Sequence, residues 1–187
     1  MEKPRLSIEN SQGEWFGCLV DDSGSLVSSA FGPDPRVVQR YLASYSKKTF
    51  GTTPELARLA AAREMIELFE GNSDSISRSL NDSFVSAFQL KVIRVMNLIP
   101  RGKVTTYGLI ANRIHSAPRP VGGAVSSNPW PLFVPCHRVV NADLTLGNYS
   151  MCGNLSKTGT DTKQAILQRE NVPILEDRID PLALWRP

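Results

Sequence analysis

The stretch VPCHRVV, residues 134–140, places a cysteine directly before a histidine inside a short apolar run. Thiols attack as thiolates, and a neighbouring imidazole or other cation can lower the pKa of a cysteine enough for this near neutral pH. Buried cysteines also pack as small, inert hydrophobes. Cys136 and His137 are therefore either a nucleophile with its base or ordinary core residues. The rest of the sequence is needed to distinguish these two possibilities.

The basic residues of this 187-residue chain are concentrated in its second half. Residues 1–84 carry nine Lys/Arg against twelve Asp/Glu, whereas residues 85–187 carry twelve against six. No acidic residue lies between Asp82 and Asp143. This asymmetry favours binding to a phosphate backbone, although a solvated basic surface would give the same pattern. The basic residues of the acid-free interval are Lys91, Arg94, Arg101, Lys103, Arg113, Arg119 and Arg138.

The composition indicates an intracellular protein without a metal centre. The sequence shows no apolar run of signal-peptide length and none long enough to span a membrane. Cys18, Cys136 and Cys152 form no CxxC pair, which suits a reducing compartment. His115 and His137 are the only histidines, so no structural zinc site is expected. We expect a protein of the cytoplasm, or of the nucleus in a eukaryote, that needs no cofactor.

The first 80 residues predict a small α/β domain, because strand-like segments give way to helical spacing of apolar residues. A stretch rich in Ser, Asn and Asp at residues 71–83 predicts the connection to a second domain, residues 81–187. The expected elements of residues 1–80 are a strand at 14–20, a turn at 21–24, a strand at 25–31, a helix opening at Pro33-Asp34-Pro35, a loop at 46–53 and a helix from Pro54 to Gly71.

The second domain predicts a helix-turn-helix. Two short helices joined by a tight, proline-bounded turn and carrying basic residues are typical of this motif. The expected elements are a helix capped by Asn81 or Asp82 that ends before Pro100, a helix at 107–114 capped by Thr105 or Thr106, a turn at 116–119 and a helix at 120–127.

Several segments around the cysteine together resemble the 6-O-alkylguanine-DNA alkyltransferase family. They are PCHRV at 135–139, RPVGGAVSSNP at 119–129, LGNYS at 146–150, TYG at 106–108, and Glu170 in a later helix. The resemblance covers residues 84–172. It implies an α/β (α+β) fold, with a ribonuclease-H-like N-terminal domain before a mostly helical domain with a winged-helix-like helix-turn-helix. It also implies direct-reversal DNA repair, in which an alkyl group moves once from the 6-oxygen of guanine to the protein's own cysteine.

The resemblance assigns the chemical roles. Cys136 is the nucleophile, and His137, oriented by Glu170 and acting through a water, is expected to hold it as a thiolate. Tyr107 matches a tyrosine that hydrogen-bonds the guanine ring and helps the base to leave. Asn128 matches an asparagine that ties the recognition segment to the active-site segment.

The resemblance also assigns a pocket for the extruded base. Tyr149, Ser150 and Pro131 are expected to form its walls, with Ser150 donating a hydrogen bond to the alkylated oxygen. The backbone carbonyls of Cys136 and Val139 are expected to accept from the exocyclic amine. Proteins recognise a flipped base in a pocket that has apolar walls and a few hydrogen-bond donors and acceptors.

The expected partner is double-stranded DNA that contains alkylated guanine, bound in the minor groove by a monomer. Arg119 matches an arginine that enters the base stack and fills the place of the flipped guanine. Gly122 and Gly123 let the helix approach the backbone closely, and Thr106 is also expected to contact DNA. The sequence departs from the family pattern at Pro118 and Pro120, which flank Arg119, and in a longer segment at residues 151–162 that contains Cys152.

Three other functions fit parts of the sequence. Alkyltransferase-like proteins recognise damaged DNA without the reactive cysteine, and Cys136 argues against that reading. A cysteine hydrolase with a Cys-His-Glu site would need an oxyanion hole and a substrate groove, which nothing in the sequence predicts. A helix-turn-helix transcription regulator would read a particular base sequence in the major groove. Sequence-independent binding that favours methylated guanine separates these alternatives.

Overall fold

A computed structural model describes residues 3–74, 78–150, 152 and 155–187, and shows a mixed α/β protein. The chain divides into two compact units. The first contains the chain up to Phe84 together with Pro129–Phe133 and Cys152. The second contains Val85–Asn128, Val134–Ser150 and the chain from residue 155 onward.

The first unit is built on a four-stranded sheet in the order β3-β2-β1-β4. Strands β1 (Arg5–Ser11), β2 (Glu14–Val20) and β3 (Leu26–Gly32) form an antiparallel meander, and the short β4 (Glu55–Leu56) pairs with β1 in parallel. The predicted hairpin of residues 14–31 is confirmed. The strand at Arg5–Ser11 was not predicted from the sequence.

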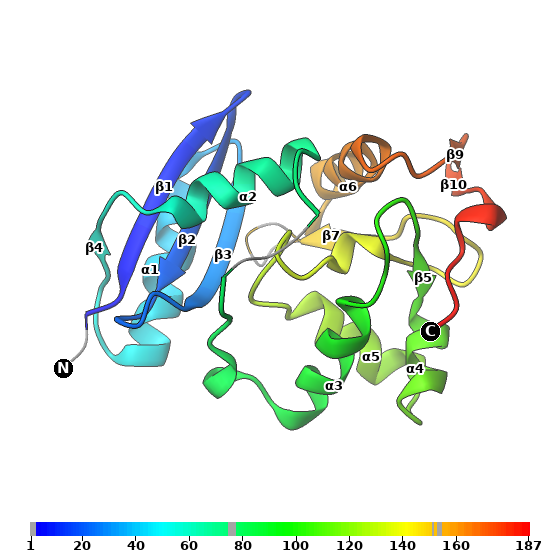
Figure 1. The fold of residues 1–187 in the computed structure, drawn as a ribbon, viewed down its shortest axis with the longest axis horizontal. Coiled ribbons are helices and arrows are strands. Elements are labelled where there is room, and N and C mark those ends of the chain that lie inside the picture. The colour runs from blue at the N-terminus through cyan, green and yellow to red at the C-terminus, as the bar shows by residue number, and fades with distance from the viewer. Residues whose placement is uncertain (1–2, 75–77, 151, 153–154) are drawn as a thin grey trace. The chain divides into compact units, whose positions relative to one another are not determined.

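Two helices cover opposite faces of this sheet, α1 (Pro35–Phe50) and α2 (Ala60–Glu70) (Figure 1). Side chains alternate between the faces of a strand. The Phe16 ring accordingly meets Phe69 of α2, while Gly17 faces Val38 and Leu42 of α1. The apolar alternation of β2 therefore gives the sheet two buried faces.

The predicted helix boundaries of the first unit were wrong in two places. Residues 46–50 continue helix α1, because the left-handed conformation that ends the helix falls at Gly51 (φ 72°). Pro54 does not start a helix, because the Glu55 and Ala57 amides donate to backbone carbonyls at the start of β1. Helix α2 ends at Gly71 (φ 77°), as predicted.

Three chain segments outside the meander are attached to β3. The predicted linker, residues 71–83, lies partly outside the described residues, but Leu80 pairs with Leu26. The Trp130 indole is buried and donates to the Leu26 carbonyl at 3.0 Å. The Cys152 thiol donates to the Phe31 carbonyl. Residues from two later parts of the chain thus complete the first unit.

The second unit contains the predicted helix-turn-helix. Helices α4 (Tyr107–Arg113) and α5 (Pro118–Ser126) pack on each other, and both contact α3 (Ala87–Met96). Thr106 caps α4 by accepting from the Leu109 amide, as one of the two predicted caps. The remaining elements of this unit are the 3-10 helices Cys136–Arg138 and Pro181–Ala183, the strands β5 (Thr105–Thr106), β6 (Val139–Val140), β7 (Tyr149–Ser150), β8 (Leu155–Ser156), β9 (Ile174–Leu175) and β10 (Arg178–Ile179), and helix α6 (Lys157–Arg169). A further 3-10 helix, Asp82–Phe84, ends the N-terminal part of the first unit.

Two predicted starts of helices in the second half of the chain were wrong. Helix α3 begins at Ala87 because Ser86, rather than Asn81 or Asp82, accepts from the Gln89 amide as its cap. Helix α5 begins at Pro118 rather than at Pro120. Both prolines fall in its first turn, where a backbone N–H would have no intrahelical acceptor, so the N–H that proline lacks costs no hydrogen bond. Arg119 therefore lies within the first turn of α5.

Gly17 allows α1 to pack directly on β2. A Cβ atom on Gly17 would lie 2.6 Å from Leu42 Cδ1 and 2.7 Å from Val38 Cγ1. We expect Gly17→Ala to lower the free energy of unfolding by about 1–3 kcal/mol, the cost of overpacking. Urea unfolding measures this, with Gly122→Ala as a control, because nothing lies within 4 Å of a Cβ there. Equal stabilities for wild type and Gly17→Ala would contradict the close packing.

Candidate active site

Cys136 begins the 3-10 helix Cys136–Arg138 and is buried, with 7% of its surface exposed. Its amide donates to the Val134 carbonyl, and its own carbonyl accepts from the Val139 amide. Val139 then enters β6, which pairs with β5. The thiol is therefore fixed on a tight turn, and the same turn presents His137 and Arg138 in fixed directions.

The resting state of the thiol differs from the expected thiolate. Burial raises the pKa of Cys136 above its ordinary value. Hydrogen bonds with Asn128 and Tyr149 and the positive charge of Lys163 act in the opposite direction but do not outweigh burial. The resting site therefore favours a protonated thiol near neutral pH.

His137 and Glu170 form a buried pair, with His137 Nε2 2.9 Å from Glu170 Oε1. Burial lowers the pKa of His137 despite the carboxylate beside it, so the imidazole is neutral. Since the carboxylate can only accept, Nε2 carries the proton of the neutral ring and donates it to Glu170. Nδ1 is left as an acceptor, and it has no hydrogen-bond partner among the described residues.

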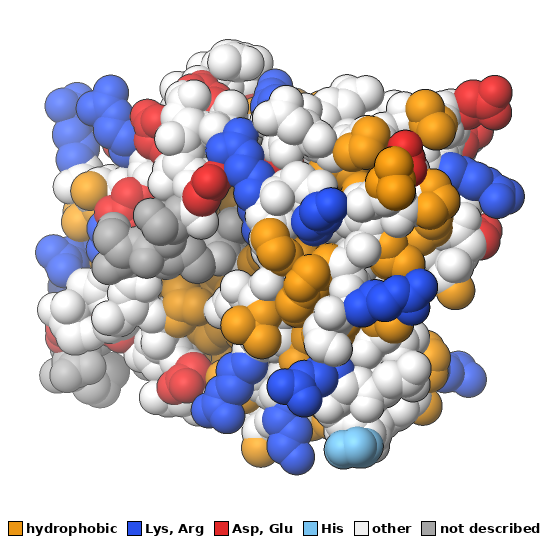
Figure 2. Space-filling model, turned by 45° about the vertical axis from the view of Figure 1, so that its right-hand side comes forward, with side chains coloured by type: hydrophobic (Ala, Val, Ile, Leu, Met, Phe, Trp, Pro, Cys, Tyr) orange, Lys and Arg blue, Asp and Glu red, His pale blue; other side chains and the backbone are white. Residues whose placement is uncertain are grey.

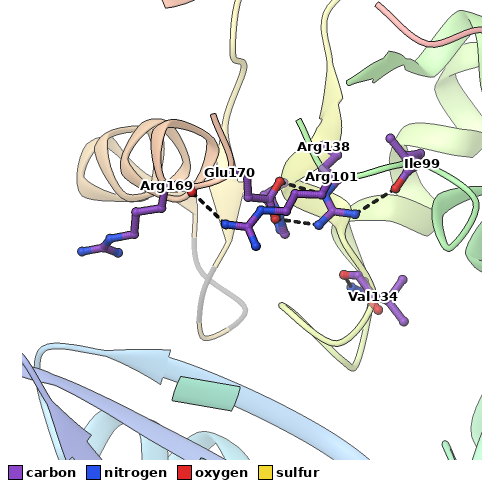
Figure 3. Close-up of polar contacts among 8 residues, drawn as sticks. Ile99, Arg101, Val134, Arg138, Arg169 and Glu170 are labelled. Atoms are coloured by element: carbon purple, nitrogen blue, oxygen red, sulfur yellow. Dashed lines mark hydrogen bonds and ion pairs between the residues drawn. The ribbon is translucent and has the colours of Figure 1, made fainter. Parts of the chain in front are cut away.

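Arg138 holds the same carboxylate and was not given this role from the sequence (Figure 3). Its Nε donates to Glu170 Oε2 at 2.8 Å and its Nη2 to Oε1 at 2.7 Å. Burial works against the charged carboxylate, but His137 and Arg138 outweigh it and lower the pKa of Glu170 to about 2. The carboxylate is therefore a fixed anion that is already paired with a permanent cation.

The turn at residues 99–102 anchors this network to the end of α6. Arg138 Nη1 donates to the Ile99 carbonyl, and Arg101 Nη2 donates to the Arg169 carbonyl (Figure 3). Gly102 has φ 74°, and a Cβ there would lie 3.4 Å from the Glu170 carbonyl oxygen. Two of the seven basic residues of the acid-free interval, Arg101 and Arg138, thus donate hydrogen bonds to other groups of the protein.

A cavity of about 40 Å³ opens beside the thiol. Its lining brings together five residues predicted from the sequence, and it adds three that were missed. A cavity of this size has room for at least one water molecule. The predicted residues are Tyr107, Asn128, Cys136, Tyr149 and Ser150, and the additional ones are Val125, Ser126 and Asn148.

Asn128 connects the end of the helix-turn-helix to the cysteine segment. Its side-chain amide donates to the Val134 carbonyl at 3.1 Å, and it also hydrogen-bonds the thiol. Burial raises the pKa of Tyr107 above its ordinary value, so its hydroxyl stays protonated near neutral pH. Tyr149 is likewise a neutral phenol, because burial raises its pKa well above the ordinary value.

Two predicted pocket residues do not line this cavity. Pro131 belongs to the first unit, where its carbonyl accepts from the Ser29 hydroxyl at 3.0 Å. The Val139 carbonyl accepts from the buried ammonium of Lys163 at 2.7 Å. A carbonyl oxygen has a second lone pair, so this bond leaves Val139 able to accept from a ligand.

The predicted DNA-binding residues lie on the helix-turn-helix. Arg119 is exposed, Gly123 is exposed and Gly122 is half-buried, whereas Thr106 is buried and its hydroxyl caps α4. Figure 2 shows Lys and Arg side chains gathered in the lower part of the view, close to a histidine. The exposed basic residues of the acid-free interval are Lys91, Arg94, Lys103, Arg113 and Arg119.

Among the residues that the structure describes, no group of three or more His, Cys, Asp or Glu side chains is arranged to hold a metal ion. Within the same residues, no helix is both long enough and apolar enough to cross a membrane.

The fold and the site define a protein that joins a helix-turn-helix to a small pocket with a buried cysteine. The model of the family "6-O-methylguanine DNA methyltransferase, DNA binding domain" matches residues 87–172. A methylated-DNA–protein-cysteine methyltransferase of Thermococcus kodakarensis is 38% identical over 178 residues, which cover 89% of this chain and 97% of that protein. The one from Methanocaldococcus jannaschii is 38% identical over 127 residues, 65% of this chain and 70% of that protein.

Solved structures agree with this match. The crystal structure of the O6-methylguanine-DNA methyltransferase from the archaeon Pyrococcus kodakaraensis strain KOD1 has a TM-score of 0.72 at 28% identity, covering 89% of this chain and 99% of that one. The chain belongs to the methylated-DNA–protein-cysteine methyltransferase family.

The lowered pKa of Glu170 makes the fold sensitive to acid. A carboxylate whose folded pKa is about 2 stabilises the protein above its unfolded pKa, near 4.5, and this contribution is lost as the pH falls toward 2. Its size is on the order of 3 kcal/mol. We expect Glu170→Gln to be less stable than wild type at pH 7, with the difference shrinking between pH 5 and pH 2. Urea unfolding at each pH measures it, with the exposed Glu176→Gln as control. A stability difference that does not change with pH would contradict a lowered pKa of Glu170 in the folded protein.

Proposed function

We propose that this protein repairs DNA by direct reversal, moving a methyl group from the 6-oxygen of guanine onto Cys136. The observation that carries the proposal is the cavity in which Cys136 meets Tyr107 and Asn128, with His137 next to Cys136 on the same turn and hydrogen-bonded to the Glu170 carboxylate. A thiol with phenol and amide donors beside one cavity, and a base on the adjoining residue, match what displacement at a carbon bonded to oxygen requires. The alkylated duplex, the residue roles and a monomeric state are parts of this proposal.

The reaction starts with the transfer of the thiol proton to His137 Nδ1. This atom is the acceptor left by the Nε2 bond to Glu170, and in our proposal a water relays the proton to it. The thiolate then attacks the methyl carbon. A sulfur–carbon bond forms and the carbon–oxygen bond breaks. The departing guanine takes up one proton in place of the methyl group, which balances the proton that the thiol gave to His137, so the products are S-methylcysteine and unmodified guanine.

Tyr107 assists the departure of the base. Its raised pKa keeps the hydroxyl protonated, so it donates a hydrogen bond to a ring nitrogen of guanine as negative charge builds up there. Ser150 donates a hydrogen bond to the 6-oxygen in the same way. The backbone carbonyls of Cys136 and Val139 accept hydrogen bonds from the exocyclic amine. Because a thioether has no easy leaving group, each molecule acts once.

Helix α5 links DNA binding to the pocket. Arg119 lies in its first turn, while Val125 and Ser126 at its other end line the cavity. Val125 follows Arg119 by six positions in the sequence, which is about 9 Å along the helix axis. Arg119 fills the place of the flipped guanine, and Gly122 and Gly123 present a surface without side chains to the sugar–phosphate backbone of the minor groove.

The fold classes of the two units and the place where the protein works are part of the same proposal. We infer that the meander with its two helices is ribonuclease-H-like and that the helix-turn-helix is winged-helix-like. We also infer that the protein works where the DNA is, in the cytoplasm or in a eukaryotic nucleus. An alkyltransferase-like protein that only recognises damage is disfavoured, because the thiol of Cys136 lines the pocket.

Methyl transfer has a direct test. We expect a duplex with one 6-O-methylguanine to add a single methyl group to the peptide that contains Cys136, read by peptide mass, at a stoichiometry of one per protein. Cys136→Ser should accept none, because the hydroxyl is a far weaker nucleophile than the thiol. The matched control is Cys152→Ser, which should accept one methyl group as wild type does. Methyl on another residue, or full acceptance by Cys136→Ser, would refute the proposal.

The role of Arg119 is tested by comparing substrates. We expect Arg119→Ala to slow methyl transfer from the duplex roughly tenfold or more, since each 1.4 kcal/mol lost from the flipped state is tenfold in rate. Transfer from the free base 6-O-methylguanine needs no flipping and should keep its rate. Arg40→Ala, an exposed change on α1, is the control. Equal slowing for the duplex and the free base would show that Arg119 acts on the pocket instead.

A further inference from the structure

The first turn of α5, which carries Arg119, is not held by packing. Residues 117–120 are all exposed, and burial in this helix begins only at Val121. The residue before the helix is Ala117, whose methyl side chain cannot cap it, whereas the neighbouring helices α3 and α4 each begin with a side-chain cap. The conformation of this turn therefore depends on local backbone preferences.

Few hydrogen bonds depend on the start of α5 at Pro118. The Val121 amide donates to the Ala117 carbonyl at 3.4 Å, which is longer than an ordinary N–H···O bond. In an α-helix an amide donates to the carbonyl four positions earlier, so the Gly122 amide is paired with the Pro118 carbonyl. These two bonds are the ones that a later start of the helix breaks.

The sequence favours a second start two residues later. Proline is preferred as the first residue of a helix, and it disfavours the helical conformation in the residue before it. A helix that begins at Pro120 satisfies both preferences, with Arg119 extended as the residue before the helix. This conformer loses the bonds of Val121 and Gly122, but the Gly123 amide keeps the Arg119 carbonyl as its acceptor.

Pro118 favours the start that the structure shows. Its ring fixes its own φ near the helical value, and it disfavours the helical conformation for Ala117, which is extended at φ −110° and ψ 155°. Both effects place the helix boundary directly before Pro118. Arg119 then belongs to the same helix as Val125 and Ser126, which line the cavity.

We propose that Pro118 is a positioning residue that keeps Arg119 inside α5, against the competing helix start at Pro120. In the helical conformer the backbone of Arg119 has a fixed distance and direction from the cavity. In the extended conformer it lies outside the helix and has to be reordered before its side chain fills the base stack, so the reactive fraction is smaller. The role of Arg119 on DNA rests on the proposed function, whereas the conformation of the turn does not require DNA.

Amide hydrogen exchange, resolved by NMR in the whole chain, measures this equilibrium. The reporters are the Val121 and Gly122 amides, and Gly123 is an internal control because both helix starts keep its hydrogen bond. We expect Pro118→Ala to lower the protection factors of the two reporters about twofold to fivefold, because replacing a compatible proline raises the entropy of the competing conformer. The protection factor of Gly123 should not change.

Pro120→Ala is the matched variant and should act in the opposite direction. It removes the proline that begins the competing helix and lifts the restriction on Arg119, so the protection of both reporters should rise. A new cap provides the rescue. Ala117→Ser, added to Pro118→Ala, supplies a hydroxyl that accepts from the Arg119 amide and should restore the protection. All three positions are exposed, so these changes leave the core intact.

The consequence for repair is read by comparing substrates. Below saturation, methyl transfer from the methylated duplex should be slower in Pro118→Ala than in wild type, by no more than the factor seen in exchange. The added Ala117→Ser should restore this rate. Transfer from the free base 6-O-methylguanine, which needs the pocket but not Arg119, should keep its rate in every variant.

Unchanged protection of the two reporters in Pro118→Ala would overturn the proposal, and so would a loss of protection in both proline variants. A duplex rate that stays at the wild-type value although protection has fallen would overturn it as well, because the turn would then not position Arg119 for the reaction. Failure of the wild-type protein to accept methyl from the duplex would instead refute the proposed function, and the exchange measurement would still stand.

Discussion

The site depends on one buried carboxylate that two neighbouring side chains share. Glu170 binds His137 through Oε1 and Arg138 through both oxygens, and His137 and Arg138 are consecutive residues of the turn that starts with Cys136. A lone buried carboxylate would be too costly to keep charged. With Arg138 neutralising it, Glu170 fixes the imidazole without protonating it, and His137 remains a neutral base.

This arrangement differs from a simple Cys–His pair, in which the imidazole holds the cysteine as a thiolate. The thiol is buried, and its pKa is raised rather than lowered. The surroundings of Cys136 therefore favour the protonated thiol at rest. For a protein that reacts once this is an advantage, because a permanent thiolate would be exposed to loss by reaction with small electrophiles or oxidants.

Sequence reasoning was most successful where chemistry and local pattern coincide. Tyr107, Asn128, Cys136, Tyr149 and Ser150 line one cavity, although they are scattered over more than forty residues. It missed Arg138 as the partner of Glu170, because a basic residue in a basic region suggests a surface. It also missed Lys163, although Lys163, Ile166, Leu167 and Glu170 follow the spacing of one helix face and are all buried.

The sequence by itself determined the family and the helix-turn-helix and singled out the cysteine that lines the cavity, because these depend on residue types at fixed short spacings. Only the tertiary structure decided which charges are paired in the interior, that α5 starts at Pro118, and that Pro129–Phe133 and Cys152 pack on the N-terminal sheet. The physical reason is that burial sets the protonation and pairing of a side chain. Burial is a property of neighbours brought together by the fold, and their distance along the chain does not encode it.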